Sequence, residues 1–173
     1  MVEYNVANVK VSLKTSKIFL DNVFTLATEK NIFCKNYKNF IVLKSRFTYI
    51  IFKSKEKQSE SHINITKIRS VSKILEAIDS ITTLILCTVI SYKIDNIIAT
   101  TNLKRNLNLS DISKTCNFKN LKYNNEKFPG LFVKFETGTV ILFHSGKLVI
   151  VGCKTEEDIS CLIQKICAHI LIV

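Results

Sequence analysis

The feature that most constrains the fold of this chain is an internal repeat. The segment 37–52, YKNFIVLKSRFTYIIF, can be laid without a gap on 128–143, FPGLFVKFETGTVILF. After a polar insertion, the segment 63–78 can be laid in the same way on 148–163. Few residues are identical, but the apolar alternation and the order of the expected elements agree between the copies. The sequence therefore predicts two tandem copies of one structural unit.

Each copy is expected to contain a strand, a short helix, several strands and a long helix. In the second copy, the short runs 131–135, 140–143 and 148–151 are rich in β-branched and aromatic residues and are separated by glycine-containing turns. After Thr155, apolar residues recur at intervals of three and four, which predicts an amphipathic helix. Thr155 and Asp158 have the spacing of a capping box at its start.

The strands of the second copy carry apolar side chains on both faces. Alternation places on one face Leu131, Val133, Phe135, Val140, Leu142, Leu148 and Ile150. The other face receives Phe132, Ile141, Phe143, Val149 and Val151. The helices are expected to cover one face only, because the turns are too short to hold crossover helices on the other. The uncovered apolar face predicts a binding surface, unless a second copy or a partner covers it.

The chain is strongly basic, with a net charge of +11. Residues 1–88 carry +7 and residues 89–173 carry +4, so the charge is not confined to a tail. Such a surface favours polyanions, that is nucleic acid or an acidic membrane, although the charge can also serve solubility alone. The most apolar stretch, 81–90, is too short to span a bilayer, and we expect no membrane association.

The residue types that carry catalysis or bind metals form no recognisable pattern. The sequence has no glycine loop that could cradle a phosphate and no pairing of a nucleophile with a base. Its six cysteines contain no CxxC pair, which argues against a zinc site and favours buried, reduced thiols in an intracellular protein. We therefore expect no enzymatic activity, no cofactor, no metal and no small-molecule substrate.

Three segments of the second copy carry a family resemblance: IDNIIATTNLKRNLNLSDIS (94–113), YNNEKFPGLFVKF (123–135) and ILFHSGKLVIVGCKTEEDI (141–159). In this order and spacing they resemble a repeat of the TATA-binding protein (TBP) family, whereas the first copy resembles it only in outline. The resemblance implies an α+β saddle made of two tandem β-α-β4-α repeats, a degenerate one over 1–88 and a second over 89–173. Their ten strands would form one curved antiparallel sheet with four helices on its convex face.

The resemblance also implies a function. A TBP-like transcription initiation factor would bind and bend A+T-rich promoter DNA through the minor groove and recruit general transcription factors and the RNA polymerase machinery. It would work in the nucleus, or in a viral factory if the source is viral. The A+T-biased composition suggests a large DNA virus or a parasitic eukaryote. The alternative is a TBP-fold protein–protein interaction module that has lost sequence-specific DNA binding.

Site residues follow from the resemblance by position. The DNA-intercalating rings would be Phe128, Phe143, Tyr37 and Phe52. The floor that meets the bases would contain Asn96, Ile98, Ile141, Val149, Val151 and Thr66. Phosphates would be contacted by Lys134, Lys147, Lys154 and Arg69, and a protein partner by Glu126. The competing interpretations are core aromatic residues for the rings, a strand-end cap for Asn96 and plain solvated side chains for the lysines.

The sequence departs from the family pattern at several positions. Val151 stands where the family has a threonine that bonds a base, and Leu43 falls where the second copy has Lys134. Asn8 is a candidate for a second central asparagine, while Lys10 and Asn64 would be unusual on an apolar floor. These departures predict a relaxed sequence preference, or DNA held mainly by the second copy.

Overall fold

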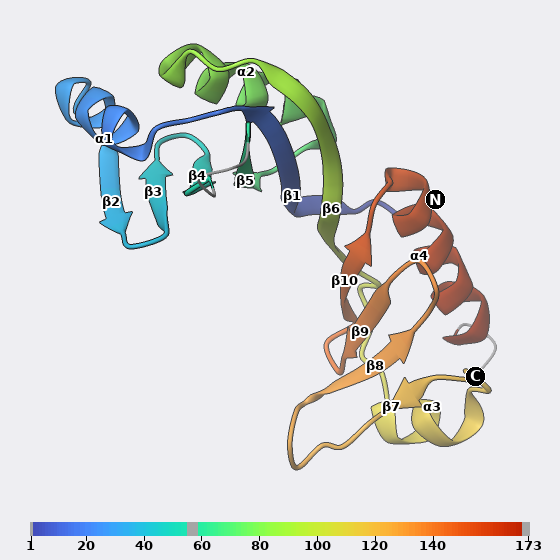
Figure 1. Ribbon diagram of the computed structural model, residues 1–173. Helices are drawn as coiled ribbons and strands as arrows, with labels where there is room; N and C mark the ends of the chain where they lie inside the picture. Colours follow the sequence, from blue (N-terminus) through green and yellow to red (C-terminus); the bar gives the residue numbers. More distant parts are fainter. Residues whose placement is uncertain (1, 55–58, 171–173) are drawn as a thin grey trace. The chain divides into compact units, whose positions relative to one another are not determined.

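The computed structural model describes residues 2–54 and 59–170. In chain order, the first copy contains β1 (Asn5–Ser16), α1 (Leu20–Glu29), β2 (Phe33–Tyr37), β3 (Phe40–Lys44), β4 (Thr48–Phe52), β5 (Glu60–Ile68), the short 3-10 helix η1 (Val71–Lys73) and α2 (Ile74–Ile85). The second contains β6 (Val89–Asn102), α3 (Leu109–Thr115), β7 (Leu121–Lys122), β8 (Gly130–Lys134), β9 (Thr139–Phe143), β10 (Lys147–Cys153) and α4 (Glu156–Ile170). The predicted order of strand, helix, four strands and helix occurs twice (Figure 1).

Hydrogen bonds join the ten strands in the order β2-β3-β4-β5-β1-β6-β10-β9-β8-β7. The predicted α+β class, with a ten-stranded sheet and four α-helices among the described residues, is confirmed. The chain forms two compact units, which we call the N-terminal unit (8–95) and the C-terminal unit (1–7 with 96–173). The predicted repeat boundary lies at the start of β6, whereas the compact units divide inside this strand.

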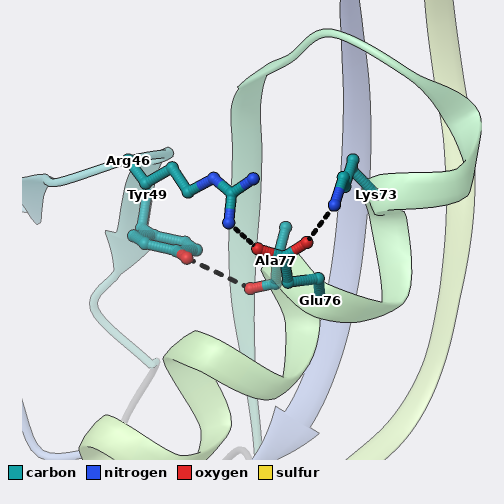
Figure 2. A network of polar contacts seen from close by, with 5 residues as sticks. All are labelled: Arg46, Tyr49, Lys73, Glu76 and Ala77. Carbon is teal, nitrogen blue, oxygen red and sulfur yellow. Dashed lines mark hydrogen bonds and ion pairs between the residues drawn. The ribbon is translucent and has the colours of Figure 1, made fainter.

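In the N-terminal unit, α1 packs on β2 and β3, and α2 packs on β5. The alternating residues Ile41, Leu43, Tyr49 and Ile51 are buried beneath the helices. The hydroxyl of Tyr49 donates a hydrogen bond of 3.2 Å to the carbonyl of Ala77 in α2. Beside this contact, Glu76 pairs with Arg46 and with Lys73, as Figure 2 shows. The buried tyrosine therefore joins the helix to the sheet, while the exposed ion pairs add little stability.

In the C-terminal unit, α4 packs on β10 and α3 packs on β8. The predicted capping box at the start of α4 is present: the Asp158 N–H donates to Thr155 Oγ1 at 3.1 Å, and the Thr155 N–H donates to Asp158 Oδ2 at 3.1 Å. Burial raises the pKa of Asp158, but the hydrogen bonds from the backbone of Lys154 and from Thr155 outweigh it and hold the pKa below its ordinary value. Thr155 and Asp158 thus fix where α4 begins.

The two β-hairpins that the repeat alignment superposes differ by one residue in their turns. Leu43 pairs with Tyr49 across β3 and β4, whereas Val133 pairs with Val140 across β8 and β9. The turn between β8 and β9 is one residue longer, so the ungapped alignment is wrong over its first part. Lys44, rather than the buried Leu43, corresponds to Lys134.

Cysteine burial differs from the sequence expectation. Cys153 is buried and Cys161 is exposed, while the other four cysteines are half-buried. Burial, helped by the charge of Asp158, raises the pKa of the Cys153 thiol to about 11. The expectation of buried thiols is therefore correct for Cys153 alone. Within residues 2–54 and 59–170, no helix is both long and apolar enough to cross a membrane.

Candidate nucleic-acid interface

The C-terminal unit has an apolar sheet face that its helices leave uncovered. Ile98, Ile141, Val149 and Val151 are half-buried and alternate with fully buried neighbours. Val149 pairs with Ile141 on one side and with Thr100 on the other, so these side chains lie in one row across three strands. The helices pack against the opposite, fully buried face. The four apolar residues predicted for the floor of this unit therefore share one surface.

Two predicted intercalating rings meet at the end of this surface. The ring centroids of Phe128 and Phe143 lie 6.0 Å apart, and Phe132 lies 5.1 Å from Phe128. Phe128 is 39% exposed. A Cβ atom built on Gly130 would lie only 2.6 Å from the Phe128 ring and 2.9 Å from Ile141. The glycine therefore makes room for a ring that is packed on one side and open to solvent on the other.

The loop before Phe128 is organised by Asn124. Its side-chain oxygen accepts a hydrogen bond of 3.1 Å from the N–H of Glu126, and its backbone carbonyl accepts one of 3.0 Å from the N–H of Phe128. Glu126, the predicted partner-binding residue, is exposed within this turn. Glu126 lies two residues before Phe128, so a protein bound by Glu126 would lie beside the end of the candidate surface.

The N-terminal unit has a matching group of three rings, one of which sequence reasoning missed. Tyr37 and Phe52 do not form a direct ring pair; each contacts Phe40, which lies 4.6 Å from Tyr37 and 6.0 Å from Phe52. Tyr37 and Phe52 are 39% and 36% exposed. Phe40 thus lies beside Phe52 at the same separation as Phe128 beside Phe143. Its alternation with the buried Ile41 could have revealed it.

Asn96 and Asn8 occupy corresponding places, each in its own unit. Asn96 Oδ1 accepts a hydrogen bond of 2.6 Å from the N–H of Gly152, and Asn8 Oδ1 accepts one of 2.7 Å from the N–H of Lys67. Both donors have positive φ, 93° at Gly152 and 65° at Lys67. Each asparagine therefore caps an irregularity of the sheet. The Nδ2 group of each asparagine remains able to donate a hydrogen bond to another acceptor.

The uncovered face of the N-terminal unit is more polar. Thr66, a predicted floor residue, corresponds to Val151 and is half-buried. Lys10, Ser12 and Asn64 also lie on this face, because they alternate with buried residues of β1 and β5. Asp95 joins them: Ser12 donates a hydrogen bond to its carboxylate, and Lys10 lies 3.4 Å from it. A charged pair therefore stands where the other unit has only apolar side chains and threonine.

The predicted phosphate-contacting residues are exposed. Lys134 and Lys147 lie at strand ends, and Lys154 and Arg69 directly follow the last strand of each unit. Among the described residues, none of the four has an ion-pair partner. Lys44 is a further candidate, revealed only by the strand register. No group of three His, Cys, Asp or Glu side chains in the described ranges could hold a metal ion.

Together these features describe a tandem-repeat protein with an uncovered sheet face, ringed by aromatic and basic residues. Residues 91–171 match the sequence model of the family described as "Transcription factor TFIID (or TATA-binding protein, TBP)". The whole chain also resembles the solved structure of Methanococcus jannaschii TBP, with a TM-score of 0.77, 29% identity and coverage of 99% of both chains.

Curated relatives each match less than half of the chain. One is the TATA-box-binding protein of Picrophilus torridus, which is 40% identical over 42% of this chain and 41% of its own length. Another is TATA-box-binding protein 3 of Methanosarcina mazei, 44% identical over 38% of this chain and 37% of its own length. The matches thus span about two fifths of these relatives. Residues 91–171 are a domain of the TATA-binding protein family, and the chain has the fold of that family's core.

Proposed function

We propose that this protein is a TATA-binding-protein-like initiation factor that binds A+T-rich promoter DNA in the minor groove and bends it. The observation that carries the proposal is the uncovered apolar face of the C-terminal unit, ending in the partly exposed Phe128–Phe143 pair. Apolar side chains fit a widened minor groove, and rings at its edge can enter a base step and kink the duplex. The cationic residues at the strand ends would neutralise phosphates.

We further propose that the bound protein recruits general transcription factors and RNA polymerase machinery, with Glu126 as one contact. It would then act where promoters are, in a nucleus or a viral factory. The protein would bind DNA through complementary shape and charge and would catalyse no reaction on it. The matched relatives are themselves called TATA-box-binding proteins, and the proposal assigns the function in that name to this chain.

A salt series tests the proposal directly. The full chain is titrated with A+T-rich and G+C-rich duplexes at several salt concentrations. We expect tighter binding to the A+T-rich duplex and a log–log salt slope that falls by about 0.9 for each phosphate contact removed. Replacing Lys134, Lys147 and Lys154 together by alanine should reduce the slope accordingly.

A matched control removes the same charge from elsewhere in the C-terminal unit. Lys114, Lys119 and Lys165 lie in or after helices and are also exposed. Their triple alanine variant should keep most of the wild-type slope. Equal slopes for the two triple variants, or an affinity that does not depend on salt, would contradict the proposal.

A second function is favoured by the polar face of the N-terminal unit. A carboxylate such as Asp95 faces unfavourable electrostatics in a minor groove lined with acceptors. If the C-terminal unit has lost DNA binding as well, the protein would act as an interaction module on the TBP fold. In that case the wild-type protein would bind neither duplex in a salt-dependent way.

A further inference from the structure

The Asp95 carboxylate is held on the uncovered face of the N-terminal unit by three neighbours. The Ser12 hydroxyl donates a hydrogen bond to it, Lys10 Nζ lies 3.4 Å from Oδ2, and Lys93 Nζ lies 3.7 Å from Oδ1. The Ser12 hydroxyl also lies 3.1 Å from Asn64 Oδ1. The side chain of Asp95 remains 21% exposed, so a ligand can reach it. A fixed hydrogen-bond acceptor thus stands on a surface that otherwise suits a minor groove.

Asp95 can accept hydrogen bonds but cannot donate them. Burial raises its pKa, but the Ser12 hydrogen bond and the charges of Lys10 and Lys93 outweigh burial and hold the pKa below its ordinary value. The carboxylate is therefore ionised at neutral pH. An ionised carboxylate has two acceptor oxygens and no donor, and its hydrogen bonds are stronger than those of neutral acceptors.

The minor groove offers such a group one kind of partner. An A·T pair presents only the acceptors N3 and O2 there, in either orientation, whereas a G·C pair adds the donor amino group N2 of guanine. Against an A·T pair, the Asp95 carboxylate would face acceptors and lose water without compensation. Against a G·C pair, it would gain a charge-assisted hydrogen bond, while the neighbouring Lys10 ammonium can donate to N3 or O2.

We propose that Asp95 is a specificity-determining residue that selects one G·C pair within an otherwise A+T-rich site, by accepting a hydrogen bond from the guanine N2 amino group. This inference rests on the proposed minor-groove function and deepens it. Lys10 and Ser12 are the positioning residues, since they hold the carboxylate on the open face. The corresponding residue in the repeat is Ala7, so the C-terminal unit has no equivalent acceptor at that place.

The experiment adds and removes the minor-groove amino group alone. In an A+T-rich duplex, each adenine is replaced in turn by 2,6-diaminopurine, which adds the amino group while the pair remains A·T-like in the major groove. At the best position, a G·C pair and an inosine·C pair are then compared, because inosine lacks the amino group. We expect one position at which the amino group strengthens binding of the full chain about tenfold.

Three variants assign this preference to the carboxylate. Asp95→Ala should lose the tenfold effect. Asp95→Asn keeps the size of the side chain, and its one amide oxygen can still accept from Ser12, but it lacks the charge and the second acceptor oxygen and should lose most of the effect. The control Asp79→Asn removes an exposed acid from α2 of the same unit and should keep the preference. Thermal unfolding of each variant checks that it is folded. Where the alanine variant is unstable, the binding preference of Asp95→Asn serves as the test.

Failure of this inference can be told apart from failure of the proposed function. If the wild type binds the A+T-rich duplex with a steep salt slope, but amino groups weaken binding at every position, Asp95 does not select guanine. A preference that survives in Asp95→Ala overturns the assignment as well. If no duplex is bound in a salt-dependent way, the minor-groove function itself is wrong, and this inference fails with it.

Discussion

Removing the Phe128 ring should separate its part in DNA bending from its part in stability. The ring is 39% exposed and packs on Phe132 and Phe143. Complete burial of a phenylalanine side chain contributes about 1.5–3 kcal/mol, so the buried three fifths of this ring contribute about 1–2 kcal/mol. No closed cavity is left, because the site opens to solvent. Phe128→Ala should therefore unfold about 2–8 °C below the wild type.

The same variant should lose most of its ability to bend DNA. A phenyl ring inserted at a base step unstacks and kinks the duplex, and alanine cannot do this. Bending is measured by energy transfer between dyes at the two ends of an A+T-rich duplex, with protein at saturating concentration. Thermal unfolding is recorded on the same preparation.

Phe118→Ala is the matched control. This half-buried ring of the same unit lies 5.8 Å from Phe135 and 4.6 Å from His169, so it belongs to the side of the sheet covered by α4. Its loss should also destabilise the protein but should leave the bend intact. Wild-type bending by Phe128→Ala, or a loss of the 3–5 kcal/mol typical of a core phenylalanine, would refute this role of the ring.

Other predictions concern the second ring cluster, the capping box and the thiols. Phe40→Ala should weaken bending as Phe52 loses its neighbour, and an unchanged bend would confine the mechanism to the C-terminal unit. Thr155→Ala should lower the unfolding free energy by about 0.5–2 kcal/mol in urea titrations, and no loss would mean the cap is unimportant. The pKa of Asp158 is lower in the folded protein than in the unfolded chain. The ionised carboxylate therefore stabilises the folded state fully above the unfolded pKa near 4, and this stabilisation disappears as the pH falls through the folded pKa. The stability difference from Asp158→Asn should therefore shrink in acid, and a constant difference would exclude an ionic role. At pH 8 a thiol reagent should modify Cys161 before Cys153, in a peptide map of the native protein; the reverse order would contradict the burial of Cys153.

Local pattern in the sequence was sufficient to predict the elements and their faces. Alternation assigned Leu131 and Val133 to the buried face and Ile141 and Val149 to the other, and burial in the structure agrees. The reason is that side chains of a strand alternate whatever the strand pairs with. The capping box at Thr155 was equally local, since its hydrogen bonds join residues three apart.

Register and cross-strand neighbours were decided only by the tertiary structure. The turn between β8 and β9 is one residue longer than the turn between β3 and β4, which moves Lys44 to the place that alignment assigned to Leu43. The pairing of β3 with β4 brings Phe40 opposite Phe52. The Asp95 site joins residues of β1 and β6 that are more than eighty positions apart in the chain. Strand register depends on turn length and on packing against distant strands, so no local pattern contains it. The sequence by itself thus determined which elements form and which faces are apolar, and the folded sheet decided which side chains meet on them.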